Sequence, residues 1–357
     1  MAVLSGSEPR FSPNGARILT TSPSRSGSLW DVATAKVVAT LEDNHSVLWR
    51  ARFSPDGRRI VASSKGHTAC VWEAATGKLL ATLAGHEDDV WNARFSPDGA
   101  RVATASKDAT ARVWEAATGK LLLTLAGHTG SVGSVEFSPD GTRLVTASAD
   151  KTARVWNAAT GKRVSTLGCD GHAVNDAKFS PDSGRVMTAS EEIDVWEAST
   201  GKLLSRLARH DPRFDQLILS EEFSPDGSRV LVATEKHPAR VWDASTGRLI
   251  ASFGEPGEEN GEVSAHYSAD GTRIITGSIN GAARIWSILP PTAGPPPEWF
   301  GDFLHYLGQK QLNADGELVE VPHDEWLALG QKLRAVLRAE EGKRTPYLEI
   351  LRYFVKE

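Results

Sequence analysis

Two sets of histidine, serine and aspartate residues with identical spacing are the part of this sequence best suited to do chemistry. They are His86, Ser106 and Asp108, and His128, Ser148 and Asp150. Such residues can act as a nucleophile, a general base and an orienting carboxylate, as in serine hydrolases. In both sets, 22 residues separate the histidine from the aspartate. Because a catalytic triad has no reason to occur twice at one spacing, the duplication favours a structural role.

Other enzyme signatures are absent from the sequence. It contains no glycine-rich loop that would hold a phosphate, no histidine pair at helical spacing and no isolated nucleophile motif. The ten histidines are scattered, and Cys70 and Cys169 are the only cysteines. Two cysteines are too few for a thiolate metal site or a disulfide framework, and they fit a reducing compartment. We therefore expect no catalytic residues, no metal and no cofactor.

An aromatic residue recurs along the chain at a nearly constant interval. The positions are Phe11, Phe53, Phe95, Phe137, Phe179, Phe223 and Tyr267, which are 42, 42, 42, 42, 44 and 44 residues apart. A tryptophan follows each of them after 17 to 19 residues, at Trp30, Trp72, Trp114, Trp156, Trp196, Trp242 and Trp286. A period of this length is typical of proteins built from repeated supersecondary units. The chain is expected to contain seven units.

Each unit has the pattern of four short strands joined by tight turns. In the unit around Phe95, strands are expected at 90–95, 101–106, 111–114 and 120–125, with a Ser-Pro-Asp-Gly turn after the first. A four-stranded sheet cannot bury both of its faces alone, but neighbouring sheets can cover each other when they are stacked radially. The sequence therefore predicts an all-β, seven-bladed β-propeller of antiparallel blades.

The repeats resemble the WD-repeat family. The resemblance covers residues 1–289 and includes the Gly-His dipeptides at 85–86, 127–128 and 171–172 and the Trp-Asp pairs at 30–31 and 242–243. It implies that each set above is joined to a tryptophan in a structural hydrogen-bond network. These networks would comprise His86, Ser106, Asp108 and Trp114, and His128, Ser148, Asp150 and Trp156.

The first and last units depart from the pattern. Pro9 lies in the expected first strand of unit one, where it removes a ladder donor. After Trp286 the chain continues into prolines instead of a fourth strand. The last blade could be completed by the N-terminus, as is usual in the family, or by residues 317–321. A third alternative is a preceding segment of a longer protein.

A proline-rich linker is expected at 290–297, followed by a helical segment over 298–357. Apolar residues recur at helical spacing around 299–307, 326–337 and 347–355. These amphipathic stretches could cap the propeller or bind a partner helix. The segment is similar to C-terminal tails of bacterial WD-repeat proteins.

The connections that lead into the first strands are rich in acidic residues. These connections contain twelve acidic residues, Asp88, Asp89, Glu258 and Glu259 among them, and two arginines. The excess is therefore ten negative charges. This face would attract a basic partner segment, or it could be a solvated rim that aids solubility. Trp49, Trp91 and Phe214 lie in or near these connections and could bind a partner or pack between blades.

The sequence therefore favours a non-catalytic scaffold that binds a protein or peptide on its loop face. The alternative is a sensor or regulatory domain of a larger bacterial signalling protein with a kinase or caspase-like effector. The net charge of -5 argues against a general nucleic-acid binder. Because the sequence has no long apolar run and no signal peptide pattern, we expect a cytoplasmic protein that does not enter the membrane. The oligomeric state is left open.

Overall fold

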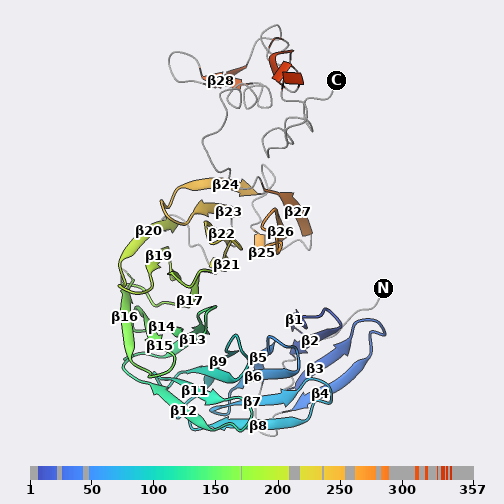
Figure 1. Cartoon of the computed structure of the whole chain (residues 1–357), viewed down its shortest axis with the longest axis vertical. Coiled ribbons are helices and arrows are strands. Elements are labelled where there is room, and N and C mark those ends of the chain that lie inside the picture. Colours follow the sequence, from blue (N-terminus) through green and yellow to red (C-terminus); the bar gives the residue numbers. More distant parts are fainter. Residues whose placement is uncertain are drawn as a thin grey trace. The chain divides into compact units, whose positions relative to one another are not determined.

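The computed structural model consists almost entirely of antiparallel strands (Figure 1). It describes residues 7–21, 26–42, 48–169, 171–208, 218–234, 237–253, 262–278 and 283–288. In the C-terminal part it describes residues 310–312, 318–320, 328, 331–333, 335, 336, 338 and 339. Two compact units divide the chain, one of Met1–Asp270 with Ile274–Trp286, the other of Gly271–Arg273 with Ser287–Glu357.

Seven sheets follow one another along the first unit, each with its strands in chain order. Sheet 1 contains β1 (Ser7–Phe11), β2 (Arg17–Thr21), β3 (Ser26–Asp31) and β4 (Val37–Glu42). Sheet 2 contains β5 (Leu48–Phe53), β6 (Arg59–Ser64), β7 (Thr68–Glu73) and β8 (Leu79–Ala84). Sheet 3 contains β9 (Val90–Phe95), β10 (Arg101–Ser106), β11 (Ala111–Glu115) and β12 (Leu121–Leu125).

The remaining sheets repeat this order. Sheet 4 contains β13 (Val132–Phe137), β14 (Arg143–Ser148), β15 (Thr152–Asn157) and β16 (Arg163–Gly168). Sheet 5 contains β17 (Asp176–Phe179), β18 (Arg185–Ala189), β19 (Ile193–Glu197) and β20 (Leu203–Ala208). Sheet 6 contains β21 (Ile218–Phe223), β22 (Arg229–Thr234), β23 (His237–Asp243) and β24 (Leu249–Phe253). Sheet 7 contains β25 (Glu262–Tyr267), β26 (Arg273–Ser278) and β27 (Ala283–Ser287).

The turn after each first strand is fixed by local polar contacts. In sheet 3, Gly99 adopts a φ of 68° and donates its N–H to the carbonyl of Ser96 at 2.8 Å. The Ser96 hydroxyl donates to the Asp98 carboxylate and accepts the N–H of Arg101 at 2.9 Å. Equivalent contacts begin at Ser12, Ser54, Ser138, Ser180 and Ser224. The repeated turn sequence therefore sets the same hairpin in each of these sheets.

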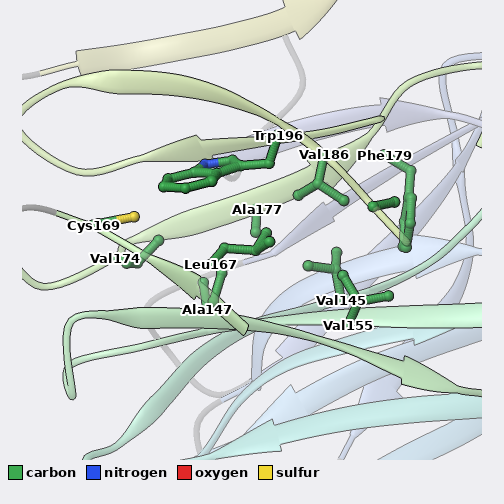
Figure 2. Close-up of a cluster of buried hydrophobic side chains, with 12 residues drawn as sticks. Val145, Ala147, Val155, Leu167, Cys169, Val174, Ala177, Phe179, Val186 and Trp196 are labelled. Carbon is green, nitrogen blue, oxygen red and sulfur yellow. The ribbon is translucent and has the colours of Figure 1, made fainter. Parts of the chain in front are cut away.

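The hydrophobic core lies between neighbouring sheets. Separate clusters of buried side chains join sheets 1 and 2, 2 and 3, 3 and 4, 4 and 5, and 5 and 6. Figure 2 shows the cluster between sheets 4 and 5, where Val145 and Leu167 face Phe179, Val186 and Trp196. Each sheet thus covers a face of the next, as the repeat pattern predicts.

An arginine from each of several second strands also crosses to the following sheet. Arg101 donates to the carbonyls of Ala158 at 2.9 Å and Gly141 at 3.1 Å, both in turns that flank strands of sheet 4. Its guanidinium lies over the ring of Phe137, 5.2 Å from the ring centroid. The pairs Arg59 and Phe95, Arg143 and Phe179, and Arg185 and Phe223 repeat this cation–π contact at 5.9, 5.7 and 6.0 Å. The recurring phenylalanine is therefore half of an inter-sheet contact.

Both ends of the repeat array differ from the middle. Pro9 lies in an irregular part of β1, where the register with β2 shifts between Ser7 and Arg10. Sheet 7 has three strands among the described residues. The suggestion that residues 317–321 complete it is wrong for Leu318–Glu320 (β29), which pair with Lys310–Leu312 (β28) in a separate two-stranded sheet. The N-terminal residues 1–6 lie outside the described part.

The C-terminal segment contains a short helical stretch. The described helical residues fall between 328 and 339, which overlaps the predicted stretch 326–337 and extends two residues beyond it. Leu333 is fully buried and Val336 is half-buried, while the other described helical residues are exposed. The helices expected around 299–307 and 347–355 lie outside the described residues. In the part of the chain that the structure describes, no helix is long and apolar enough to cross a membrane.

Candidate functional site

A buried polar network joins the strands of sheet 3. His86, just before β9, lies 2.7 Å through Nδ1 from the Asp108 carboxylate in the turn between β10 and β11. Its Nε2 lies 2.8 Å from the hydroxyl of Thr104 on β10. The same hydroxyl accepts the indole N–H of Trp114 on β11 at 2.8 Å. The network therefore ties the incoming connection to the second and third strands.

Sheet 4 contains the same network at equivalent positions. His128 Nδ1 lies 2.7 Å from Asp150, and its Nε2 lies 2.8 Å from the Thr146 hydroxyl, which accepts the Trp156 N–H at 2.9 Å. Every partner is satisfied when Nδ1 of His128 carries the proton and donates to Asp150. Nε2 then accepts the hydrogen of the Thr146 hydroxyl. This assignment requires a neutral imidazole.

The threonines Thr104 and Thr146 were missed by the sequence prediction, which named Ser106 and Ser148. The Ser106 hydroxyl instead donates to the Asp88 carbonyl at 3.0 Å and accepts the Asp108 N–H at 3.1 Å. Ser148 makes the equivalent bonds to Gly130 and Asp150. The serines shape the loops, while the threonines join histidine to tryptophan. The alternation of strand β10 makes Thr104 a second candidate beside Ser106, because residues 104 and 106 lie on one face, but it does not choose between them.

The electrostatics of the network favour fixed protonation states. Burial lowers the pKa of His86 and of His128, although the neighbouring aspartates oppose this shift. For Asp108 burial acts to raise the pKa, but hydrogen bonds from Thr110 and His86 outweigh it and hold the pKa at about 2. The pKa of Asp150 is also about 2 for the corresponding reasons. With both nitrogens of each imidazole already bonded, the intact networks are suited to joining strands.

Trp49 and Trp91 form an aromatic pair across sheets 2 and 3. They are the second residues of β5 and β9, and their ring centroids lie 6.5 Å apart with an edge-to-face angle of 75°. Trp49 is half-buried, whereas Trp91 keeps 38% of its surface exposed. The repeat spacing therefore brings these two predicted residues together, with one of them available to solvent.

A group of charged residues lies in the neighbouring connections. Asp88 and Asp89 precede β9, and Lys107 forms an ion pair with Asp88 at 3.3 Å. His67, in the turn between β6 and β7, has a ligand atom within 4.8 Å of atoms of both aspartates. These three residues could share a metal ion, although Lys107 competes for Asp88. The pKa of Asp88 is lowered, first by the N–H of Asp89 and then by Lys107 and His67.

Most of the predicted acidic face belongs to connections outside the described residues. Phe214, Glu258 and Glu259 lie outside the described residues. Its described acidic side chains are Glu87, Asp88 and Asp89, all in the connection between sheets 2 and 3. The predicted excess of charge on this face stays a prediction.

The sheets and the seams between them define a seven-bladed β-propeller. The family described as WD domain, G-beta repeat matches residues 35–73, 77–115, 119–157 and 247–287. Four stretches of the chain thus match the WD repeat, and the seven sheets fit a WD-repeat propeller. Propellers of this kind are in general interaction platforms without catalytic activity. One similar solved structure is the crystal structure of the computationally designed Ika8 protein, 24% identical, with a TM-score of 0.66. It matches 76% of this chain and 81% of its own length and supports the fold alone. No curated protein matches the chain.

Proposed function

We propose that this propeller is a non-catalytic scaffold that binds a protein or peptide through the surface formed by Trp49, Trp91, Asp88 and Asp89, here called the tryptophan surface. The edge-to-face pair of tryptophans, in which Trp91 is exposed and Trp49 is half-buried, is the observation that carries the proposal. Large aromatic side chains are frequent hot spots of protein interfaces. An aromatic pair that packed only between blades would have no reason to keep Trp91 accessible.

The position of Trp91 supports a preorganised contact. Its neighbours Val90 and Asn92 are 0% and 1% exposed, so they anchor the strand on both sides of it. Strand β9 pairs with β10 at Val90 and from Asn92 to Phe95, with a register shift at Trp91, so the backbone is held on both sides of this residue. A side chain held in this way loses little conformational freedom when a partner binds.

The charged residues beside the pair favour a partner with a basic segment. Asp88 and Asp89 carry two negative charges, and Lys107 offsets only part of them. Such charges mainly increase the association rate at low ionic strength. The affinity itself would come from burial of the indole rings.

The proposal is tested by affinity purification of partners from cells that express the protein, followed by binding measurements with the purified partner. Trp91→Ala should weaken binding by at least tenfold while the melting temperature stays within a few degrees of wild type. Leu122→Ala is the matched control, since Leu122 is 43% exposed on the outer strand β12. Equal binding by wild type, Trp49→Ala and Trp91→Ala would refute the proposed surface.

Charge steering has a separate test on the same partner. Asp88→Asn combined with Asp89→Asn should lower the association rate several-fold at low salt and have little effect at high salt, where screening is strong. A loss that is independent of salt would contradict the electrostatic part of the proposal.

A further inference from the structure

Three arginines occupy equivalent positions on neighbouring first strands. Arg10, Arg52 and Arg94 each directly precede the recurring phenylalanine at the end of β1, β5 and β9. These strands lie side by side on the inner side of sheets 1 to 3 (Figure 1). The three arginines line one hollow of about 320 Å³, together with Phe11, Phe53 and Phe95. The repeat therefore gathers three cations and three aromatic rings in one place.

The positive charge in this hollow is poorly compensated. Within the described part of the chain, Arg10 and Arg52 have no carboxylate within ion-pair distance, and Arg94 reaches Glu136 only at 4.0 Å. The Nε atoms of Arg52 and Arg94 are buried without a hydrogen-bond partner. Buried polar atoms normally have partners, and each one without a partner costs free energy. The hollow is therefore lined by arginines with donors that no acceptor in the described part of the chain satisfies.

Burial and the neighbouring positive charges both disfavour the charged form of Arg52. Burial, together with the positive charges of Arg94, Arg10 and Arg50, lowers the pKa of Arg52 to about 9. An anion placed among these groups would relieve both effects, since it would supply charge and hydrogen-bond acceptors at once.

At the corresponding positions of later sheets, the charged side chains form ion pairs with residues of opposite charge. Lys178 on β17 binds the Glu221 carboxylate at 2.7 Å and lies 3.5 Å from Asp176. On β25, His266 lies 3.1 Å from Glu222. The position before the recurring aromatic residue thus holds a charge with an ion-pair partner in sheets 5 to 7. In sheets 1 and 2 it holds an arginine without such a partner in the described part of the chain. The arginine cluster is a local departure from the repeat.

We propose that this hollow, the arginine pocket, binds the phosphate group of a small phosphate monoester. The guanidinium groups of Arg10, Arg52 and Arg94 would donate to the phosphate oxygens, for which their planar forks are well suited. The volume is near the lower end of small-molecule pockets, so it fits a compact ligand. Phe11, which is 65% exposed, provides an apolar wall for a flat organic group. The arginine pocket lies near the ends of β5 and β9, about 10 Å along the strands from Trp49 and Trp91.

Isothermal titration calorimetry of the full chain with phenyl phosphate, inorganic phosphate and phenol tests this assignment. At constant ionic strength, phenyl phosphate should bind more tightly than inorganic phosphate, and phenol should not bind measurably. Tight binding of phenol would overturn the phosphate assignment. Equal affinity for phenyl phosphate and inorganic phosphate would overturn the role of the phenylalanines.

Substitutions of the arginines test which of them bind phenyl phosphate. Arg52→Met should weaken phenyl phosphate binding at least tenfold, whereas Arg163→Met, a change of an exposed arginine on β16, should have no effect. The ligand-free melting temperature of Arg52→Met should equal or exceed that of wild type, because a half-buried charge without an ion-pair partner in the described part of the chain is removed. Arg10→Met is a second variant. Because Arg10 is exposed, its replacement should not disturb folding. Unchanged affinity in both Arg52→Met and Arg10→Met would refute the pocket.

Discussion

The hydroxyl of Thr146 is the central link of the network in sheet 4, and Thr146→Val tests what that network contributes. Valine has nearly the same shape, so the change removes the hydroxyl without opening a cavity. It leaves the Trp156 N–H and His128 Nε2 without their partners, in a site where Thr146 itself is fully buried. Each unpaired buried group costs about 1 to 3 kcal/mol. The free energy of unfolding should therefore fall by about 2 to 4 kcal/mol.

Urea denaturation at neutral pH measures this loss, with Thr124→Val as the matched control. Thr124 is exposed on the outer strand β12, so its replacement should change stability by no more than about 0.5 kcal/mol. In a Trp156→Phe background the N–H is already absent, and Thr146→Val should cost less than in wild type because one unpaired group remains instead of two. A loss below about 1 kcal/mol in the wild-type background, or strict additivity of the two changes, would refute the reasoning.

Three further measurements address other parts of the propeller. Because burial lowers the pKa of His86 and His128 below 6.5 in the folded protein, the unfolded chain takes up these protons first as pH falls. The free energy of unfolding should decrease from pH 7.5 to 5.5, and a flat profile would contradict this. Gly201→Ala should destabilise by about 1 to 3 kcal/mol, since its φ is +74° and a Cβ would lie 2.7 Å from a backbone oxygen. At Gly15 the φ is +69° and a Cβ would meet no atom within 4 Å, so Gly15→Ala should lower the free energy of unfolding clearly less than Gly201→Ala does. Thermal unfolding of the two variants measures the difference. Arg101→Met should lower the melting temperature by several degrees, because it removes two hydrogen bonds and a cation–π contact between sheets 3 and 4; no change would rule out a stabilising role.

The repeated turn made most of the fold predictable. The strands predicted around Phe95 at 90–95 and 101–106 are confirmed in full, and the other two are confirmed to within one residue at their ends. Proline and glycine restrict the backbone locally, so the hairpins follow from short stretches of sequence. The number of units followed from the spacing alone.

Side-chain partners within the network were harder to predict. Thr104 and Ser106 lie on the same face of β10 and both carry a hydroxyl, so the sequence pattern does not distinguish them. The choice depends on which one lies beside the indole of Trp114, and that is set by the register of β10 with β11. The register between strands depends on the folded structure, so the repeat pattern alone does not predict it.

The two surface sites differ in how much the sequence disclosed. Trp49 and Trp91 could be paired in advance, because residues 42 apart occupy equivalent places in adjacent units. The arginine pocket was not predicted, since an arginine before three of the recurring phenylalanines gives no sign of whether a carboxylate will reach it. Compensation depends on distances across neighbouring sheets, as the pairs formed by Lys178 show.

The arginine that crosses from one sheet to the phenylalanine of the next gives sheets 3, 4 and 5 the same contact to the preceding and to the following sheet. A unit such as 90–125 carries Phe95 to receive one partner and Arg101 to reach another. An in-frame duplication of about 42 residues would therefore arrive with both contact residues already matched to its neighbours. Such proteins can therefore lengthen by duplication of whole units. Surface residues of a new unit can then change to bind a partner while its contacts with the neighbouring sheets are kept.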